Sequence, residues 1–144
     1  MIVLDANILL YAYDERSPHY KAAKSYLEAI FSKPGPVGIP LHSVAAFLRI
    51  MTHPSLRIGR FSLEEAIEIV DEWLALPQVR LLVAGEHHWP RLRQTLLRGH
   101  ARGPLVTDAE IATLTIENGG ELQTNDRGFA RFPGLRWKNP LSSD

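Results

Sequence analysis

The first seven residues, Met1–Asn7 with the sequence MIVLDAN, decide how the rest of the chain is interpreted. Ile2, Val3 and Leu4 form a short apolar run that is typical of a strand buried on both faces. Asp5 follows directly, and the carboxyl end of a parallel strand is where open α/β sheets place their ligand sites. The stretch therefore predicts a central strand that presents an acidic side chain to a crevice.

Two later segments also end an apolar run on an aspartate. Asp126 follows a strand-like run in LQTND, and Asp108 stands at a predicted helix start in PLVTDAEIATLTI. Each aspartate by itself is equally typical of a helix cap or a turn. As a set they predict carboxylates in one crevice, where like charges repel unless a cation lies among them. The pattern therefore favours a divalent-metal site with oxygen ligands.

Hydrophobic periodicity predicts strands that alternate with helices along the chain. The expected strands span residues 2–5, 37–39, 79–83, 121–124 and 135–137. The expected helices span residues 6–13, 18–32, 41–52, 63–76, 86–100 and 108–118, with a turn and short helix at 125–130. This order predicts an α/β protein with a three-layer α/β/α fold around a central, mostly parallel sheet of about five strands. One domain is expected over residues 1–141, with a tail at 142–144.

Composition narrows the chemistry that the chain can perform. Its 144 residues fit one domain, and they include no cysteine, which excludes disulfides, zinc–thiolate sites and cysteine nucleophiles. No run of about 18 apolar residues predicts a membrane span, and Met1 leads into a strand without the basic region of a secretory signal. A cytoplasmic protein is expected. The net charge is zero, yet arginine supplies 12 of the 16 basic residues and suits phosphate contacts.

Four stretches taken together resemble PIN-domain ribonucleases and, more narrowly, the VapC-type toxins of bacterial type II toxin–antitoxin modules. They are MIVLDANILLYA, FLRIMTHP, VTDAEIATL and LQTNDRGFARFPGLRWKNP, which follow the family's order over nearly the whole chain. The resemblance implies a PIN-like fold whose acids converge at the carboxyl ends of the central strands. It also implies Mg²⁺ or Mn²⁺ at these acids, where the ion activates water for RNA cleavage.

The resemblance also implies which residues form the site. Asp5, Asp108 and Asp126 match the family's acids and are expected to be catalytic residues and metal ligands. Asp5 and Asp126 are expected to bind the ion directly, whereas Asp108 either binds it or holds its water. The polar neighbours expected to orient these carboxylates are Asn7, Thr124 and Asn125.

One acid of the family's pattern is absent. The usual glutamate of the third helix stands two residues before a Leu-Arg pair, here Leu48-Arg49, so Ala46 occupies its place. This favours one firmly bound ion over two. Two possible substitutes are His42 and Glu110. His42 lies one helical turn from Ala46. Glu110 lies two residues after Asp108, and this spacing points its side chain to another face of the helix.

A basic stretch leads into Asp108, and a further arginine follows Asp126. Such residues beside an acidic site would contact the RNA backbone, whereas a solvated helix face is the commoner explanation of a charge run. The candidate RNA-binding residues are Arg91, Arg93, Arg98, Arg102 and Arg127.

The resemblance implies a ribonuclease toxin with RNA as substrate, a cognate VapB-like antitoxin as inhibitor and a homodimeric state. DNA would be contacted only through the antitoxin. Two alternatives remain open. Ala46 is compatible with a catalytically degenerate PIN fold that binds RNA or a partner without cutting. The D-A-N stretch also resembles haloacid-dehalogenase phosphatases, with Asp5 as nucleophile, but Asn7 replaces the second aspartate of their D-x-D motif.

Overall fold

The protein folds around one five-stranded sheet, seen here in a computed structural model that describes residues 1–55 and 61–142. The strand order is β3-β2-β1-β4-β5, and each neighbouring pair is parallel. The strands are β1 (Ile2–Leu4), β2 (Val37–Pro40), β3 (Val79–Leu82), β4 (Glu121–Gln123) and β5 (Trp137–Lys138). The predicted α/β/α fold is confirmed, with a sheet that is parallel throughout.

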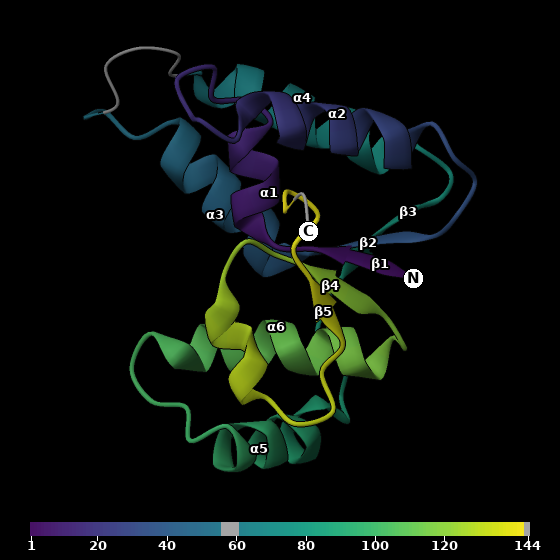
Figure 1. The fold of residues 1–144 in the computed structure, drawn as a ribbon, viewed down its shortest axis with the longest axis vertical. Coiled ribbons are helices and arrows are strands. Elements are labelled where there is room, and N and C mark those ends of the chain that lie inside the picture. Colours follow the sequence, from purple (N-terminus) through teal and green to yellow (C-terminus); the bar gives the residue numbers. More distant parts are fainter. Residues whose placement is uncertain (56–60, 143–144) are drawn as a thin grey trace.

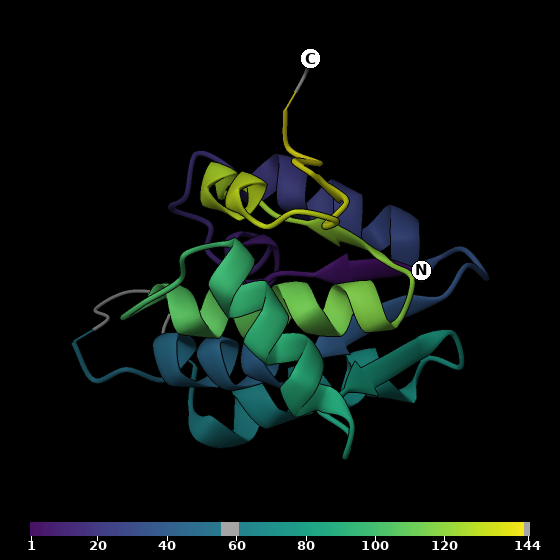
Figure 2. The ribbon, with the colours of Figure 1, turned by 90° about the horizontal axis from the view of Figure 1, so that it is seen from below.

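Helices cover both faces of the sheet (Figure 1). The first four, α1 to α4, lie on one face, and α5 and α6 lie side by side on the other (Figure 2). Their bounds are α1 (Ala6–Tyr11), α2 (Tyr20–Phe31), α3 (Leu41–Met51), α4 (Leu63–Ala75), α5 (His88–Arg98) and α6 (Leu105–Glu117), followed by the 3-10 helix η1 (Arg127–Arg131). No helix within the described residues is long and apolar enough to cross a membrane.

The central strand separates two hydrophobic cores. Leu4 packs into the core beneath α1–α4, and Val3 packs into the core beneath α5 and α6. Both side chains are fully buried, as expected because successive residues of a strand point to opposite faces. The first core holds an aromatic contact between Phe47 and Trp73, whose ring centroids lie 4.8 Å apart. The second core includes Phe129 of η1, so this short helix is anchored beside α6.

Local sequence signals explain where two of the helices begin. Ser62 caps α4, because its hydroxyl accepts from the Glu65 backbone N–H at 3.1 Å while the Glu65 carboxylate accepts from the Ser62 N–H at 3.0 Å. The expected start of α6 at Asp108 is wrong, because the helix begins at Leu105. Pro104 already adopts the helical conformation, which its ring favours at a helix start, so Asp108 lies in the first turn instead of capping it.

The sheet topology brings the acidic segments together. The chain leaves β1 through α1 and α2 to reach β2, whereas β4 lies on the opposite side of β1 and is reached through α5 and α6. Such a switch point opens a crevice at the carboxyl ends of the strands. Leu4 pairs with Gln123 in the register of β1 and β4, so Asp5 and Thr124 emerge side by side.

Candidate active site

Asp5 is held rigidly at the end of β1. It caps α1, because its Oδ1 accepts from the Ala6 backbone N–H at 2.8 Å. Its Oδ2 accepts from the Thr124 hydroxyl at 2.7 Å. The side chain is only 8% exposed, and burial raises the pKa of the carboxyl group, as does the negative charge of Asp126, although both hydrogen bonds oppose this shift.

Thr124 joins the first acid to the last. Its fully buried hydroxyl donates to Asp5 and accepts from the backbone N–H of Asp126 at 3.0 Å. It also accepts from the Asn7 side-chain amide at 3.4 Å. One hydroxyl group therefore fixes the relative positions of three residues that the sequence predicts at the site.

Hydrogen bonds to several neighbouring residues hold Asn125 in place. Its backbone N–H donates to Asn7 Oδ1 at 3.3 Å, and its side-chain amide donates to the Tyr11 hydroxyl at 3.4 Å. The Asn139 amide donates to Asn125 Oδ1 at 2.9 Å. The sequence prediction included Asn125 but missed Tyr11 and Asn139, which reach it from α1 and from the segment after β5.

Asp108 and Asp126 complete the acidic group. Asp126 caps η1 through a 2.8 Å hydrogen bond from the Gly128 backbone N–H to its Oδ1. Asp108 is half-buried in α6, and burial is the largest cause that raises its pKa to about 6. The negative charges of Asp126 and Asp5 raise it further, while Arg131 opposes them. Asp126 and Asp5 therefore lie close enough to Asp108 for their charges to act on its carboxyl group.

The two possible substitutes for the missing acid contact each other. His42 Nε2 lies against Glu110 Oε2, so the pair links α3 to α6 at the edge of the sheet. Glu110 is therefore engaged by His42. Ala46 is half-buried one turn after His42 in α3. In the part of the chain that the structure describes, His42 Nδ1 is buried without a hydrogen-bond partner.

The donor chemistry of the site fits a hard divalent cation. Among the described residues, no three His, Cys, Asp or Glu side chains stand ready to ligate one ion. Mg²⁺ often takes only one or two carboxylates and keeps several waters, so two of the acids, such as Asp5 and Asp126, would suffice as direct ligands. A cation there would offset the like-charge repulsion that raises the pKa of Asp5 and Asp108.

The predicted basic residues belong to α5, η1 and the loop before α6. Arg91, Arg93 and Arg98 lie on α5, Arg102 precedes α6, and Arg127 begins η1. Arg131, at the end of η1, donates from Nη1 to the Gly99 carbonyl at 3.3 Å. It is the basic residue whose charge acts on Asp108.

Sequence comparisons relate nearly the whole chain to known ribonucleases. A model of the PIN domain family matches residues 2–135. VapC ribonuclease Mb2897 of Mycobacterium bovis is 34% identical over 141 residues, which cover 98% of this chain and 96% of that protein. Ribonuclease VapC33 of Mycobacterium tuberculosis is 33% identical over 141 residues, which cover 98% and 99% of the two chains.

Solved structures share the fold at lower identity. VapBC2 from Rickettsia felis, bound to a promoter DNA fragment, includes a chain with a TM-score of 0.67 and 20% identity, covering 96% of this chain and 98% of that one. VapC20 of Mycobacterium tuberculosis, described as a sarcin-ricin loop cleaving toxin, gives a TM-score of 0.68 at 16% identity, with coverage of 94% and 99%. At such identities the likeness shows the fold.

Proposed function

We propose that the chain, which belongs to the PIN-domain family and within it to the VapC-type toxins, is a metal-dependent endoribonuclease. The observation that carries the proposal is the convergence of Asp5, Asp108 and Asp126 at the switch point of the sheet. RNA as the substrate is supported by the relatives, which are named ribonucleases over nearly the same length.

Each acid has a distinct task in this proposal. A divalent cation, when bound, lowers the pKa of water and offsets negative charge on the phosphate. Asp5 and Asp126 would hold the ion, and the Thr124 hydroxyl keeps Asp5 Oδ2 in position. Asp108, half-exposed in the first turn of α6, would orient the attacking water. Asn7 would act indirectly, through its hydrogen bonds to Thr124 and to Asn125.

Inhibition by a cognate VapB-like antitoxin is part of the proposal. Several structural relatives are VapBC toxin–antitoxin complexes, and those from Rickettsia felis and Salmonella typhimurium are bound to DNA. A cavity of about 300 Å³, lined mainly by apolar side chains such as Leu27, Phe31 and Leu76, would receive an apolar antitoxin segment. The protein would act as a homodimer and contact DNA only through its antitoxin.

The test is RNA cleavage by the purified protein in Mg²⁺ or Mn²⁺ and in EDTA, with Asp5→Asn and Asp126→Asn as variants. We expect cleavage that needs the metal and that falls by at least about a hundredfold in both variants. Asp71→Asn, which changes an exposed aspartate of α4, is the matched control and should cleave normally. Metal-independent cleavage, or full activity of Asp5→Asn, would contradict the proposal.

Ala46 favours one alternative, a PIN fold that binds RNA without cutting it, because the family's fourth acid is absent. The same assay separates the two functions. A folded, antitoxin-free protein that binds RNA and cleaves none in either metal would be such a binding module.

A further inference from the structure

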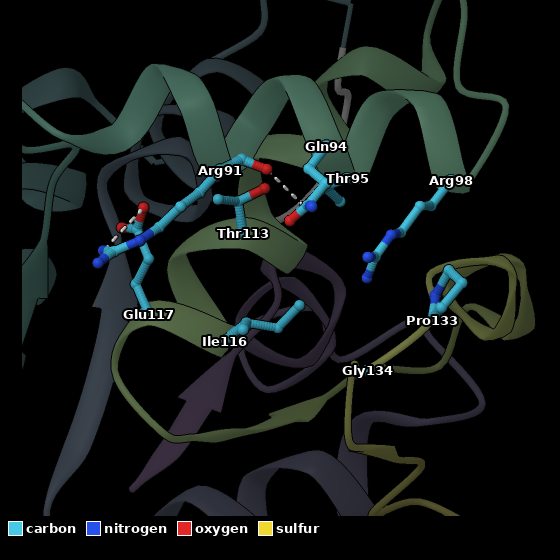
Figure 3. A pocket seen from close by; sticks show the side chains of 9 residues that line it. All are labelled: Arg91, Gln94, Thr95, Arg98, Thr113, Ile116, Glu117, Pro133 and Gly134. Atoms are coloured by element: carbon cyan, nitrogen blue, oxygen red, sulfur yellow. Dashed lines mark hydrogen bonds and ion pairs between the residues drawn. The ribbon is translucent and has the colours of Figure 1, made fainter.

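A polar cavity of about 410 Å³ opens on the face that carries the arginines. It lies between α5, α6 and the turn at Pro133–Gly134 (Figure 3). Arg91 and Arg98 enter it from α5, and Ile116 and Glu117 line it from α6. We call this cavity the Arg98 pocket. None of the proposed catalytic acids lines it.

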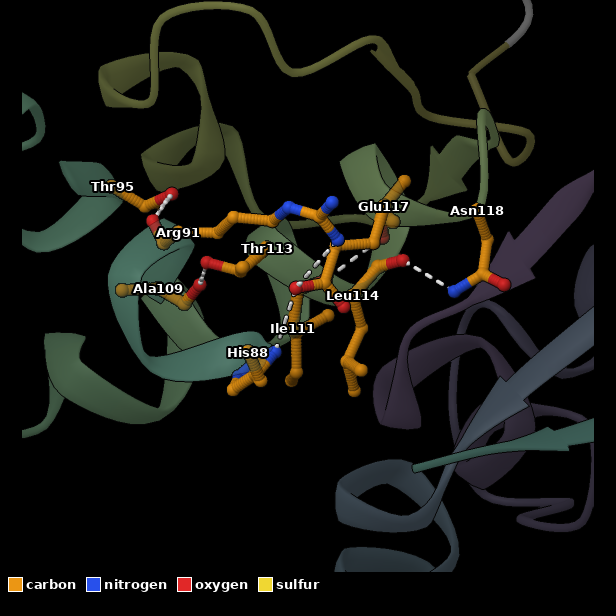
Figure 4. A network of polar contacts seen from close by, with 10 residues as sticks. His88, Arg91, Thr95, Ala109, Ile111, Thr113, Leu114, Glu117 and Asn118 are labelled. Carbon is orange, nitrogen blue, oxygen red and sulfur yellow. Dashed lines mark hydrogen bonds and ion pairs between the residues drawn. The ribbon is translucent and has the colours of Figure 1, made fainter. Parts of the chain in front are cut away.

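The charged groups of the Arg98 pocket differ in whether they have an ion-pair partner. Glu117 Oε1 lies 3.0 Å from His88 Nδ1 and 3.7 Å from Arg91 Nη1, and its side chain is only 13% exposed (Figure 4). Its negative charge is therefore already compensated within the protein. Arg98 is exposed, and among the described residues it has no ion-pair or hydrogen-bond partner. Figure 3 shows its guanidinium group directed into the cavity. The pocket thus presents an uncompensated cation.

The remaining walls suit a nucleoside. The hydroxyl groups of Thr95 and Thr113 donate to backbone carbonyls of their own helices, at 3.1 and 2.7 Å, and so are internally satisfied. Ile116 is 42% exposed, and it lies in the same cavity as Pro133. An apolar surface beside a free guanidinium group matches the ribose and base next to a phosphate.

The Arg98 pocket is connected to the acidic site by Arg131 and by α6. Arg131 donates to the carbonyl of Gly99, the residue that follows Arg98, and its positive charge acts on Asp108. Asp108 and Ile116 both belong to α6, and eight residues of helix correspond to about 12 Å along its axis. A single strand that leaves the acids would therefore pass Arg131 before it reaches the pocket.

We infer that the Arg98 pocket binds a backbone phosphate and the adjoining nucleoside of single-stranded RNA, a few nucleotides from the bond that is cut. Arg98 contacts the phosphate, Ile116 and Pro133 contact the sugar or base, and Arg131 bridges the strand between the pocket and the acids. This inference rests on the proposed ribonuclease function and extends it to the binding of flanking nucleotides.

The first test measures RNA binding without cleavage. Fluorescein-labelled single-stranded RNA is titrated in EDTA into the Asp5→Asn protein with and without Arg98→Ala. We expect Kd to rise roughly five- to tenfold in the Arg98 variant. The slope of log Kd against log salt should fall by about 0.7, the value for one phosphate contact on a single strand. Arg80→Ala is the matched control, because Arg80 is exposed on β3, does not line the pocket and is not among the candidate RNA-binding residues.

The second test uses substrate length with the catalytic residues intact. Arg98→Ala should cut a long RNA more slowly than the native protein at subsaturating concentration, and both should cut a dinucleotide equally, since it is too short to reach the pocket. Unchanged RNA affinity in Arg98→Ala, or an equal loss in Arg80→Ala, overturns the inference. Normal RNA affinity combined with weakened antitoxin binding would overturn it too and assign the pocket to a protein. Failure of the ribonuclease proposal would appear separately, as a native protein that binds RNA but cuts none.

Discussion

At the scale of single residues, Thr124 links several residues of the site through its side chain. Its hydroxyl group serves Asp5, Asp126 and Asn7 at once, and it is completely buried. The sequence predicts its place beside Asp126, because the two residues are neighbours in T-N-D. Its bond to Asp5 was beyond prediction from local sequence, because that bond depends on the pairing of β1 with β4.

Thr124→Val should damage the site while keeping its shape. The substitution leaves Asp5 Oδ2 and the Asp126 N–H without their shared partner, so we expect a loss of about 1–3 kcal/mol in the free energy of unfolding. Cleavage should fall roughly 10- to 100-fold, with a higher Mg²⁺ concentration needed for half-maximal rate. Thr124→Ser retains the hydroxyl and should keep most of the activity. An unchanged Mg²⁺ dependence in the valine variant would contradict the positioning role.

Asp108→Asn should stabilise the metal-free protein at neutral pH. Well below pH 3.8 the carboxyl group is protonated in both the folded and the unfolded protein and has no effect on stability. As pH rises from 3.8 to about 6, the unfolded form ionises first, so stability falls and the loss persists at higher pH. We expect a gain of roughly 1 kcal/mol near pH 7.5 in the variant, a figure reduced for solvent screening.

The measurement for Asp108→Asn is thermal unfolding in EDTA near pH 4 and near pH 7.5. The difference between variant and native protein should be small near pH 4 and much larger near pH 7.5. Asp71→Asn, an exposed aspartate on α4, should show no such difference. A gain of equal size at both pH values would rule out ionisation of Asp108 as its cause.

At the scale of elements, the sequence predicts well what depends on neighbouring residues and poorly what depends on tertiary contacts. Apolar runs locate all the strands to within about two residues, and the Ser62 capping box marks the start of α4. The start of α6 was misplaced because Pro104 caps the helix, which begins at Leu105, whereas Asp108 only has a residue type that is common at caps. The Asn139–Asn125 hydrogen bond joins segments on either side of η1, and no sequence motif predicts it.

The segment after β5 is therefore expected to support the acidic site. Asn139 donates to Asn125 Oδ1, and its own Oδ1 accepts from the Leu141 N–H at 3.0 Å. Asn139→Ala should loosen Asn125 and lower cleavage several-fold, with a stability loss of about 1 kcal/mol. Asn118→Ala is the matched control, because it also removes one side-chain hydrogen bond, of 2.8 Å, but at the far end of α6. Equal activity in the two variants would show that Asn139 has no part in positioning the site.

At the scale of the whole molecule, the acids come from opposite sides of the sheet. Asp5 begins a helix in the layer of α1–α4, whereas Asp108 belongs to α6 in the other layer. The His42–Glu110 contact joins these layers at the edge where the acids meet. The fold thus places like charges together at the one edge where both layers can contribute side chains, and it raises the pKa of Asp5 and Asp108 in doing so. Functional sites commonly sacrifice stability in this way.

A divalent cation should therefore stabilise the whole fold. A ligand that binds only the folded state adds about 2.7 kcal/mol at a concentration one hundred times its Kd, so we expect Mn²⁺ or Mg²⁺ to raise Tm above its value in EDTA. The rise should be largely lost in Asp5→Asn and in Asp126→Asn, because each removes a proposed direct ligand. It should be retained in Asp71→Asn, whose carboxylate lies on α4 away from the site. An equal rise in all of these proteins would mean that the ions act on the general surface charge, and the acidic crevice would then be no metal site.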